Sequence, residues 1–415
     1  MLTTRGLGLL VGAALAVVVG RLLGVGEMLV VVAAAIVLVV LAVVTVHLAA
    51  TRIAVGRAVS PPRLAFGEGC RATLELRNES RLPTALLLVE DSCPPALAAT
   101  PRFVVPALAP GSSRVMRYDV RGGARGRHVL GPVTIRVQDP FGLAERARRT
   151  RSTSDLLVHP QVEALESGRS RGAHQGHGPS RNRRLLSAGD EFHSMREYVR
   201  GDDLRHVHWP STARRQSLMV RQQEQTPQSR VTVLCDTRDV AHLGGGPSST
   251  LEKAVSIAAS ILVSLARLGY GVRLVTDESD RPPRVAPVEV WLDQLAGLRA
   301  GSARAMAQSL ERLHSESGQG LLVAVLAPPS GAEGPVAAGD LRALRTAGRS
   351  YRERLAVVVV DPGRRLSAAR GRELAATLGA SGWRAATANV GEPFAPVWQE
   401  LLAVRRRAPA GRART

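Results

Sequence analysis

The sequence predicts a multi-domain protein with an N-terminal transmembrane helical hairpin, a β-sandwich module and a doubly wound α/β domain. Three observations lead to this fold class. Two long apolar runs open the chain, short alternating apolar and polar runs follow them, and the C-terminal half alternates apolar strands with amphipathic helices. A chain of 415 residues is long enough to give two or three domains their own cores.

Two apolar runs predict a membrane hairpin over residues 1–50. Met28 to Ala50 is long enough to cross a bilayer as a helix, which takes roughly 20 apolar residues. Gly6 to Leu23 is a second such run, interrupted near its end by Arg21, whose long side chain can reach the membrane surface. A cleaved signal peptide is the alternative for this first run, but no small-residue cleavage site follows it.

Charges around the hairpin predict its orientation. Basic residues lie outside both runs, at Arg5, Arg52, Arg57 and Arg63. In the connecting turn, Arg21 is opposed by Glu27. Because basic residues are retained on the cytoplasmic side, both ends of the hairpin should face the cytoplasm. We therefore expect a multi-pass protein of the cell (inner or plasma) membrane, with the lipid bilayer as one partner and its soluble domains in the cytoplasm.

Composition bears on partners and on compartment. The formal net charge is +20, but Lys253 is the only lysine and the arginines are scattered through every segment. This scatter indicates a compositional bias, so we expect no nucleic-acid partner, and an arginine-rich polyanion binder stays open as an alternative. The three cysteines, Cys70, Cys93 and Cys235, form neither a disulfide framework nor a metal-binding spacing, and they suit a reducing compartment.

Short alternating runs predict a β-sandwich module over residues 51–160. The strand patterns are Ala72–Arg77, Ala85–Val89, Val115–Val120 and Val133–Val137. Glycine and proline turn signals separate them, and six or seven strands in roughly 100 residues are typical of an antiparallel sandwich of immunoglobulin-like type. No catalytic constellation occurs in this module.

The motif Asp139 to Leu143 stands out within the module. Asp139 and Pro140 are expected to start a turn, Phe141 to fill the core, and Gly142 to supply a backbone conformation closed to other residues. The motif is therefore predicted to be structural.

A linker over residues 161–188 precedes the last domain, predicted over residues 189–405 and followed by a basic tail, 406–415. Apolar strands are expected at Val231–Cys235, Val272–Val275, Leu321–Leu326, Leu355–Val360 and Trp383–Ala386. Helical patterns lie between them, which predicts a doubly wound parallel sheet. Asp236, Asp277 and Asp361 follow strands, at the edge where such sheets bind ligands. The glycines at 244–246 lack the Lys-Ser/Thr of a phosphate-binding loop.

The block from Gly189 to Arg221 is the densest in chemistry, and two interpretations compete for it. His206 and His208 with the pair Asp202 and Asp203 could serve a metal-dependent hydrolase, with His208 as a general base. The favoured interpretation is a compact loop that docks a partner. In that loop the carboxylates after Gly201 accept hydrogen bonds from arginine, and aromatic residues are buried as anchors. The residues given these roles are Arg205, Arg214, Tyr198 and Trp209.

The same block carries a family pattern, E-F-x-x-x-R-E-Y-x-x-G-D-D-x-R-x-x-x-W-x-x-x-A-R. It falls on Glu191, Phe192, Arg196, Glu197, Tyr198, Gly201, Asp202, Asp203, Arg205, Trp209, Ala213 and Arg214. With the Asp139–Leu143 motif and the membrane hairpin, it resembles the bacterial domain-of-unknown-function family numbered 58. The resemblance implies a von Willebrand factor A-like C-terminal half and a MoxR-type AAA ATPase as partner. It implies an interaction or adaptor protein that acts in the assembly or maturation of other proteins. Because no nucleophile stands beside a base in the sequence, we expect the protein not to be an enzyme.

The resemblance also raises the question of a metal site. Von Willebrand A domains often hold Mg²⁺ with a D-x-S-x-S motif after the first strand, because the hard cation takes oxygen ligands. Here the corresponding residues are Asp236-Thr237-Arg238-Asp239-Val240, so both serines are replaced and a positive charge is added. We expect no cofactor, and Asp236, Thr237 and Asp239 are the residues of a degenerate Mg²⁺ site.

Overall fold

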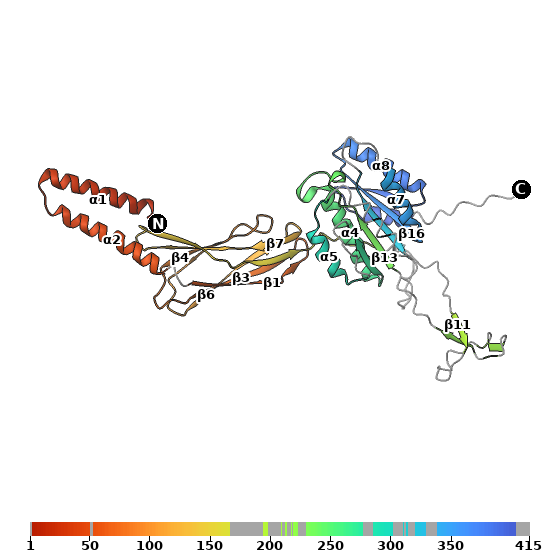
Figure 1. The fold of residues 1–415 in the computed structure, drawn as a ribbon, viewed down its shortest axis with the longest axis horizontal. Helices are drawn as coiled ribbons and strands as arrows, with labels where there is room; N and C mark the ends of the chain where they lie inside the picture. The colour runs from red at the N-terminus through yellow and green to blue at the C-terminus, as the bar shows by residue number, and fades with distance from the viewer. Residues whose placement is uncertain are drawn as a thin grey trace, which may run out of the picture. The chain divides into compact units, whose positions relative to one another are not determined.

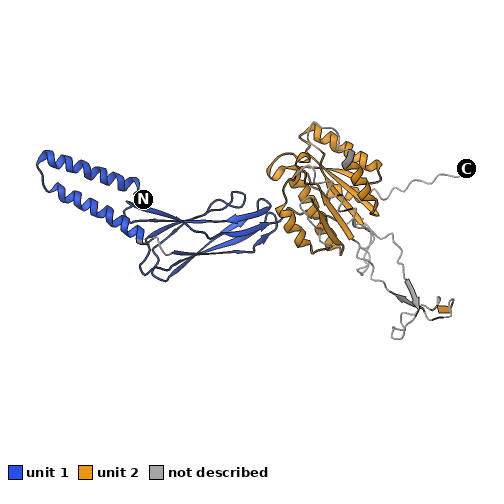
Figure 2. Ribbon diagram, viewed as in Figure 1, with its two compact units in different colours: residues 1–159 blue, residues 160–415 orange. Residues whose placement is uncertain are grey.

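The computed structural model divides the chain into two compact units, residues 1–159 and 160–415 (Figure 2). Each unit is described by itself. The structure describes residues 2–49, 53–166, 194–197, 209, 212–213, 217, 219–222, 230–276, 285–301, 310, 313, 320–328 and 338–403.

Unit 1 begins with two antiparallel apolar helices, α1 (Thr4–Leu23) and α2 (Met28–Ala49), which confirm the predicted helices (Figure 1). Helix α1 begins at Thr3, whose side-chain oxygen accepts from the backbone N–H of Gly6 at 3.2 Å. It ends at Gly24, whose φ of 72° permits a left-handed cap. Both helices are long and apolar enough to cross a membrane, with mean hydropathies of 2.2 and 3.3.

The rest of unit 1 is a β module. Its strands are β1 (Ile53–Ser60), β2 (Arg63–Leu64), β3 (Gly69–Asn78), β4 (Leu86–Asp91), β5 (Arg102–Val105), β6 (Ser113–Arg121), β7 (Gly126–Leu130), β8 (Val133–Gln138), β9 (Glu145–Arg149) and β10 (Ser154–Val158). They form three sheets with the orders β1-β3-β6, β2-β10-β7 and β5-β4-β8-β9. All pairings are antiparallel except that of β2 with β10. The described part of this module thus holds more strands than the six or seven predicted.

An enclosed ion pair joins several strands of the β module. Arg57 of β1 donates to the carboxylate of Asp91 at the end of β4, and both side chains are fully buried. The Tyr118 hydroxyl of β6 donates to the other carboxylate oxygen at 2.6 Å. Arg57 also donates to the backbone carbonyls of Leu130, at 2.6 Å, and Ser152, at 3.0 Å. Buried charges require such partners, so this network fixes how the sheets meet.

The Asp139–Leu143 motif is a turn, but its phenylalanine does not fill the core. Asp139 is buried and accepts from the backbone N–H groups of Phe141, at 2.9 Å, and Ala144, at 2.6 Å. Gly142 has a φ of 69°, as expected for a conformation that favours glycine. Phe141 is 62 % exposed, so the prediction that it is buried is wrong; the turn directs it outward, and Leu143 and Ala144 enter the core instead.

Unit 2 is built on a parallel sheet, as predicted. The strands β13 (Arg230–Cys235), β14 (Gly271–Val275), β15 (Leu321–Leu326), β16 (Glu353–Val360) and β17 (Arg384–Asn389) lie in the order β14-β13-β15-β16-β17. Every pairing in this sheet is parallel. The central strand β15 and residues 355–360 of β16 are continuously apolar, as expected of parallel strands that helices cover on both faces.

Helices cover the two faces of this sheet and create two cores. They are α4 (Thr250–Arg267), α5 (Val288–Gly297), α7 (Ala338–Arg349), α8 (Arg365–Ala380) and α9 (Ala395–Ala403). Side chains of α4, α5 and α9 pack on one face, and those of α7 and α8 on the other. Alternate residues of each strand enter alternate cores: Val233 joins the first and Leu234 the second.

A short strand pair also belongs to unit 2. Strand β11 (Ser194–Glu197) pairs antiparallel with β12 (Met219–Gln222), so residues of the family pattern lie beside a segment that follows the pattern in the sequence.

Candidate functional site

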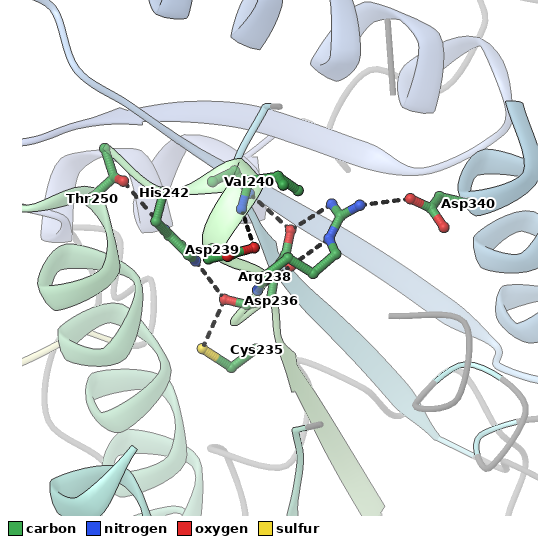
Figure 3. A network of polar contacts seen from close by, with 9 residues as sticks. Cys235, Asp236, Arg238, Asp239, Val240, His242, Thr250 and Asp340 are labelled. Atoms are coloured by element: carbon green, nitrogen blue, oxygen red, sulfur yellow. Dashed lines mark hydrogen bonds and ion pairs between the residues drawn. The ribbon is translucent and has the colours of Figure 1, made fainter. Parts of the chain in front are cut away.

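The strand order of the parallel sheet reverses between β13 and β15. Chain connections leave in opposite directions at such a point, which opens a crevice beyond the carboxyl ends of the two strands. Asp236 follows β13 and Ala327 follows β15, so both lie at this crevice. The candidate site is therefore built around Asp236 (Figure 3).

Arg238 holds the carboxylate of Asp236 with two parallel hydrogen bonds. Its Nε donates to Oδ1 at 2.9 Å and its Nη2 to Oδ2 at 2.8 Å. The backbone N–H of Arg238 donates to Oδ1 at 3.2 Å, and that of Ala327 lies 3.5 Å from Oδ2. The Asp236 side chain is fully buried and that of Arg238 is 5 % exposed. A bidentate, charge-assisted pair of this kind holds the loop in one geometry.

Arg238 also reaches a second carboxylate. Its Nη1 donates to Oδ2 of Asp340 at 2.6 Å, and Asp340 lies in the first turn of α7, where the helix dipole favours a negative charge. Burial alone would lower the pKa of Arg238, but hydrogen bonds and charge from Asp236 and Asp340 outweigh it and raise the pKa. One guanidinium thus bridges the loop after β13 and the helix that follows β15.

His242 supports the loop from the other side. One ring nitrogen, Nε2, lies 2.8 Å from the backbone oxygen of Asp236, and Nδ1 lies 3.2 Å from the hydroxyl of Thr250. Burial lowers the pKa of His242, which favours the neutral ring. A neutral ring donates from Nε2 to the carbonyl and accepts at Nδ1. The sequence analysis did not single out His242, because it belongs to no motif. Its position a few residues after the β13 strand was the only signal that could have indicated it.

The residues of the degenerate Mg²⁺ motif do not converge on one point. Both carboxylate oxygens of Asp236 already accept from a guanidinium, and Thr237 is buried. Asp239 is exposed and accepts from the backbone N–H of Val240 at 2.7 Å, within its own loop. Val240 offers no side-chain oxygen. These residues therefore do not fit a divalent cation, which needs several free oxygen ligands and no neighbouring positive charge.

A small hollow adjoins Arg238 and Asp340. Its remaining walls are apolar and come from Leu326, Ala327, Leu341, Leu344 and Leu374. The hollow therefore joins a charged cluster to an apolar surface.

The family-pattern residues are only partly described. Arg196 and Glu197 lie on β11, opposite Val220 and Met219. Glu191, Phe192, Tyr198, Gly201, Asp202, Asp203, Arg205 and Arg214 lie outside the described residues, as do His206 and His208. The docking loop and the hydrolase alternative therefore stay predictions. Among the described residues of both units, no three His, Cys, Asp or Glu side chains lie close enough together to hold a metal ion.

Trp209 corrects one expectation about this block. It is 68 % exposed, so the prediction that it is buried as an anchor is wrong. Met219 is buried instead, and its backbone N–H donates to the hydroxyl of Thr212 at 3.0 Å. A two-stranded pair has little interior of its own in which to enclose a large ring.

The comparisons with known proteins support the predicted family. Residues 194–362 match the family model described as "Protein of unknown function DUF58", and this segment contains Asp236, Arg238 and Asp340. The chain is 27 % identical to the uncharacterized protein YeaD of Bacillus subtilis (strain 168) over 53 % of its own length. That match spans about half, 54 %, of the relative.

Similar solved structures are remote. The CARDB domain of a Pyrococcus furiosus protein, in complex with di-metal ions, is 13 % identical; the match covers 26 % of this chain and 91 % of that one, with a TM-score of 0.20. Native alpha-2-macroglobulin from Escherichia coli is 22 % identical over 28 % of this chain and 18 % of the other, with a TM-score of 0.24. Likeness at this level carries no argument about fold or function.

Proposed function

Because residues 194–362 carry the DUF58 family segment, we propose that this protein is a membrane-anchored adaptor whose unit 2 binds a MoxR-type AAA ATPase. In this proposal α1 and α2 span the bilayer, both ends of the hairpin face the cytoplasm, and the β module acts as an immunoglobulin-like spacer. Unit 2 works as a von Willebrand A-like binding domain in the assembly or maturation of other proteins.

The observation that carries the proposal is the buried guanidinium of Arg238 between Asp236 and Asp340. It occupies the carboxyl edge of the sheet, where proteins of this topology bind ligands. Both carboxylates and the neighbouring His242 are engaged in hydrogen bonds, so none of them is poised as a catalytic base. A loop held rigid in this way offers a partner a surface of constant shape, which lowers the entropy lost on binding.

The membrane part of the proposal rests on α1 and α2. Each has the length and hydropathy of a membrane span. Arg5 at the beginning of α1 and the basic residues after α2 favour the cytoplasm for both ends. That orientation places the soluble parts of the chain in the compartment that holds ATP.

The test is a pull-down with full-length protein in detergent micelles. The probe is a purified MoxR-type ATPase from the same genome, without nucleotide, with ADP and with a slowly hydrolysed ATP analogue. We expect binding in at least one nucleotide state and its loss with Asp202→Ala in the family pattern. Arg238→Met should weaken binding, because the loop after β13 then loses its brace.

The control is Arg102→Ala in the β module, because Arg102 is 78 % exposed and forms only a surface ion pair with Glu90. This variant should bind as the parent does. If folded parent protein binds the ATPase in no nucleotide state, the partner assignment is wrong. If both unit 2 variants bind as tightly as the parent, the ATPase docks elsewhere on the molecule.

A further inference from the structure

The loop between β8 and β9, residues 139–143, joins the β module to the beginning of α1. Thr3 donates from its hydroxyl to the Gly142 carbonyl at 2.5 Å and from its backbone N–H to the Leu143 carbonyl at 3.0 Å. Leu2 forms an isolated antiparallel bridge with Ala144. The β8–β9 loop is therefore held at the level of the first residues of the first apolar helix.

Gly6 permits this close contact. A Cβ atom at Gly6 would lie 2.2 Å from the Leu143 carbonyl oxygen, so a larger residue would push the loop away from the helix. The second helix meets the same end of the module: Arg146 of β9 lies with its Nη1 2.8 Å from Nδ1 of His47 near the end of α2. Both helix ends thus contact the region around the β8–β9 loop.

Phe141 is held outward at this place. The two Asp139 hydrogen bonds and the left-handed Gly142 determine the shape of the turn, while Leu143 is buried. Phe141 remains 62 % exposed. A large apolar ring kept in water by a well-ordered turn is unfavourable, but beside the end of a membrane span the same ring reaches the boundary between headgroups and acyl chains.

Two basic side chains lie near the β8–β9 loop. Arg5 is exposed, and a Cβ atom on Gly142 would lie 3.6 Å from its Nη1, so its guanidinium lies beside the loop. Arg146 of β9 pairs with Val137, one residue before the end of β8, so it lies at the loop end of this strand pair. Guanidinium groups at this level complement the phosphates of anionic lipids.

We propose that the β8–β9 loop is a lipid-binding element: Phe141 enters the interfacial layer of the cytoplasmic leaflet, and Arg5 with Arg146 binds anionic headgroups. The proposal rests on the membrane anchoring proposed above and goes beyond it. It gives the β module a contact with the bilayer in addition to the two spans.

The experiment places an environment-sensitive fluorophore on the loop. The variant Phe141→Cys is labelled and reconstituted as full-length protein into phosphatidylcholine vesicles with and without phosphatidylglycerol. Cys70, Cys93 and Cys235 are buried, so labelled parent protein measures their background. The matched control is Val129→Cys, which replaces an exposed apolar residue on β7, before the turn that leads to the opposite end of β8.

We expect a blue shift at position 141 and loss of most of its emission when lipids carry a shallow quencher, with a larger effect in phosphatidylglycerol. Position 129 should remain in water. Equal quenching at the two positions, or a water-like spectrum at 141 in vesicles that retain the protein, overturns the lipid-binding loop alone. Failure of the protein to float with vesicles after alkaline extraction would overturn the anchoring itself, so the two failures are distinguishable.

Discussion

The two units each bury an arginine against an aspartate, and the surroundings of the two pairs differ. Around Arg57 and Asp91 in the β module both side chains are fully enclosed, and the other partners are Tyr118 and backbone carbonyls. Around Arg238 in unit 2, Asp340 is 19 % exposed and an apolar hollow adjoins it. The first pair joins strands in an interior, whereas the second ends at a carboxylate that is partly exposed to solvent.

The two surroundings differ in how strongly they disfavour charged side chains. Burial raises the pKa of Asp91, although the hydrogen bond from Tyr118 and the charge of Arg57 act to lower it. Burial likewise raises the pKa of Tyr118, and its hydrogen bond to Asp91 adds to that effect. An enclosed pair is expensive to desolvate, so its loss should be felt mainly as stability. A pair at an edge can admit water when one partner is removed.

Breaking the enclosed pair should give the largest effect. Asp91→Ala leaves Arg57 charged and buried without its partner, and we expect a loss of about 3–5 kcal/mol in the free energy of unfolding. Hydrogen exchange of the β-module peptides in full-length protein measures it. Arg57→Met combined with Asp91→Leu should lose less, because no uncompensated charge remains. Equal losses in the single and double variants would contradict this account of the pair.

Breaking the edge pair should cost less. In Arg238→Met, Asp236 keeps two backbone donors and Asp340 turns to water, so we expect a loss of about 1–3 kcal/mol. Denaturant unfolding followed by tryptophan fluorescence reports on unit 2, where Trp291, Trp383 and Trp398 are buried. If Arg238→Met lowered the free energy of unfolding as much as Asp91→Ala, the edge of the sheet would exclude water as completely as the interior of the β module.

Replacing Arg238 and Val240 with serines tests whether the guanidinium is what prevents Mg²⁺ from binding beside Asp236. Arg238→Ser with Val240→Ser frees Asp236 and Asp340 and adds two oxygen ligands. We expect Mg²⁺ to stabilise this variant by about 1 kcal/mol at a concentration several times its Kd, seen as a rise in Tm. The parent and Val240→Ser alone should show no such rise. Stabilisation of the parent would mean that Arg238 leaves the edge easily.

The smallest effect should come from His242. Burial lowers its pKa in the folded chain, whereas the unfolded chain binds a proton near the ordinary value of 6.5. Stability from the neutral ring is therefore present above that value and lost as the pH falls below it. His242→Gln keeps a donor to the Asp236 carbonyl and should lose less stability between pH of about 7 and about 5. Parallel pH curves for parent and variant would exclude this role.

The sequence predicted the helix pair, the β module and the parallel sheet of unit 2, because the patterns that indicate them are long. Apolar helices of membrane length and continuously apolar parallel strands such as Leu321–Leu326 remain recognisable in any tertiary context. The immunoglobulin-like and von Willebrand A-like assignments stay predictions. Strands as short as β2, with two residues, leave no pattern to detect, which is why the β module was predicted with too few strands.

Single side chains were predicted less well. Phe141 and Trp209 were expected in cores because aromatic residues usually are buried, but the direction of one side chain depends on the local turn. Arg238 was recognised as unfavourable to a metal, whereas its contact with Asp340, more than 100 residues away, depends on the fold of the sheet edge. His242 has no motif at all, and only the hydrogen bond to the Asp236 carbonyl reveals it.

The guanidinium of Arg238 is a cation that cannot diffuse away. A bound Mg²⁺ leaves when its concentration falls, whereas a positive charge tethered two residues from Asp236 stays at a high effective concentration whatever the ionic composition of the cell. A chelator should therefore not switch this edge off, and a rise in divalent ions should not switch it on. The geometry of this edge is therefore independent of the supply of divalent ions.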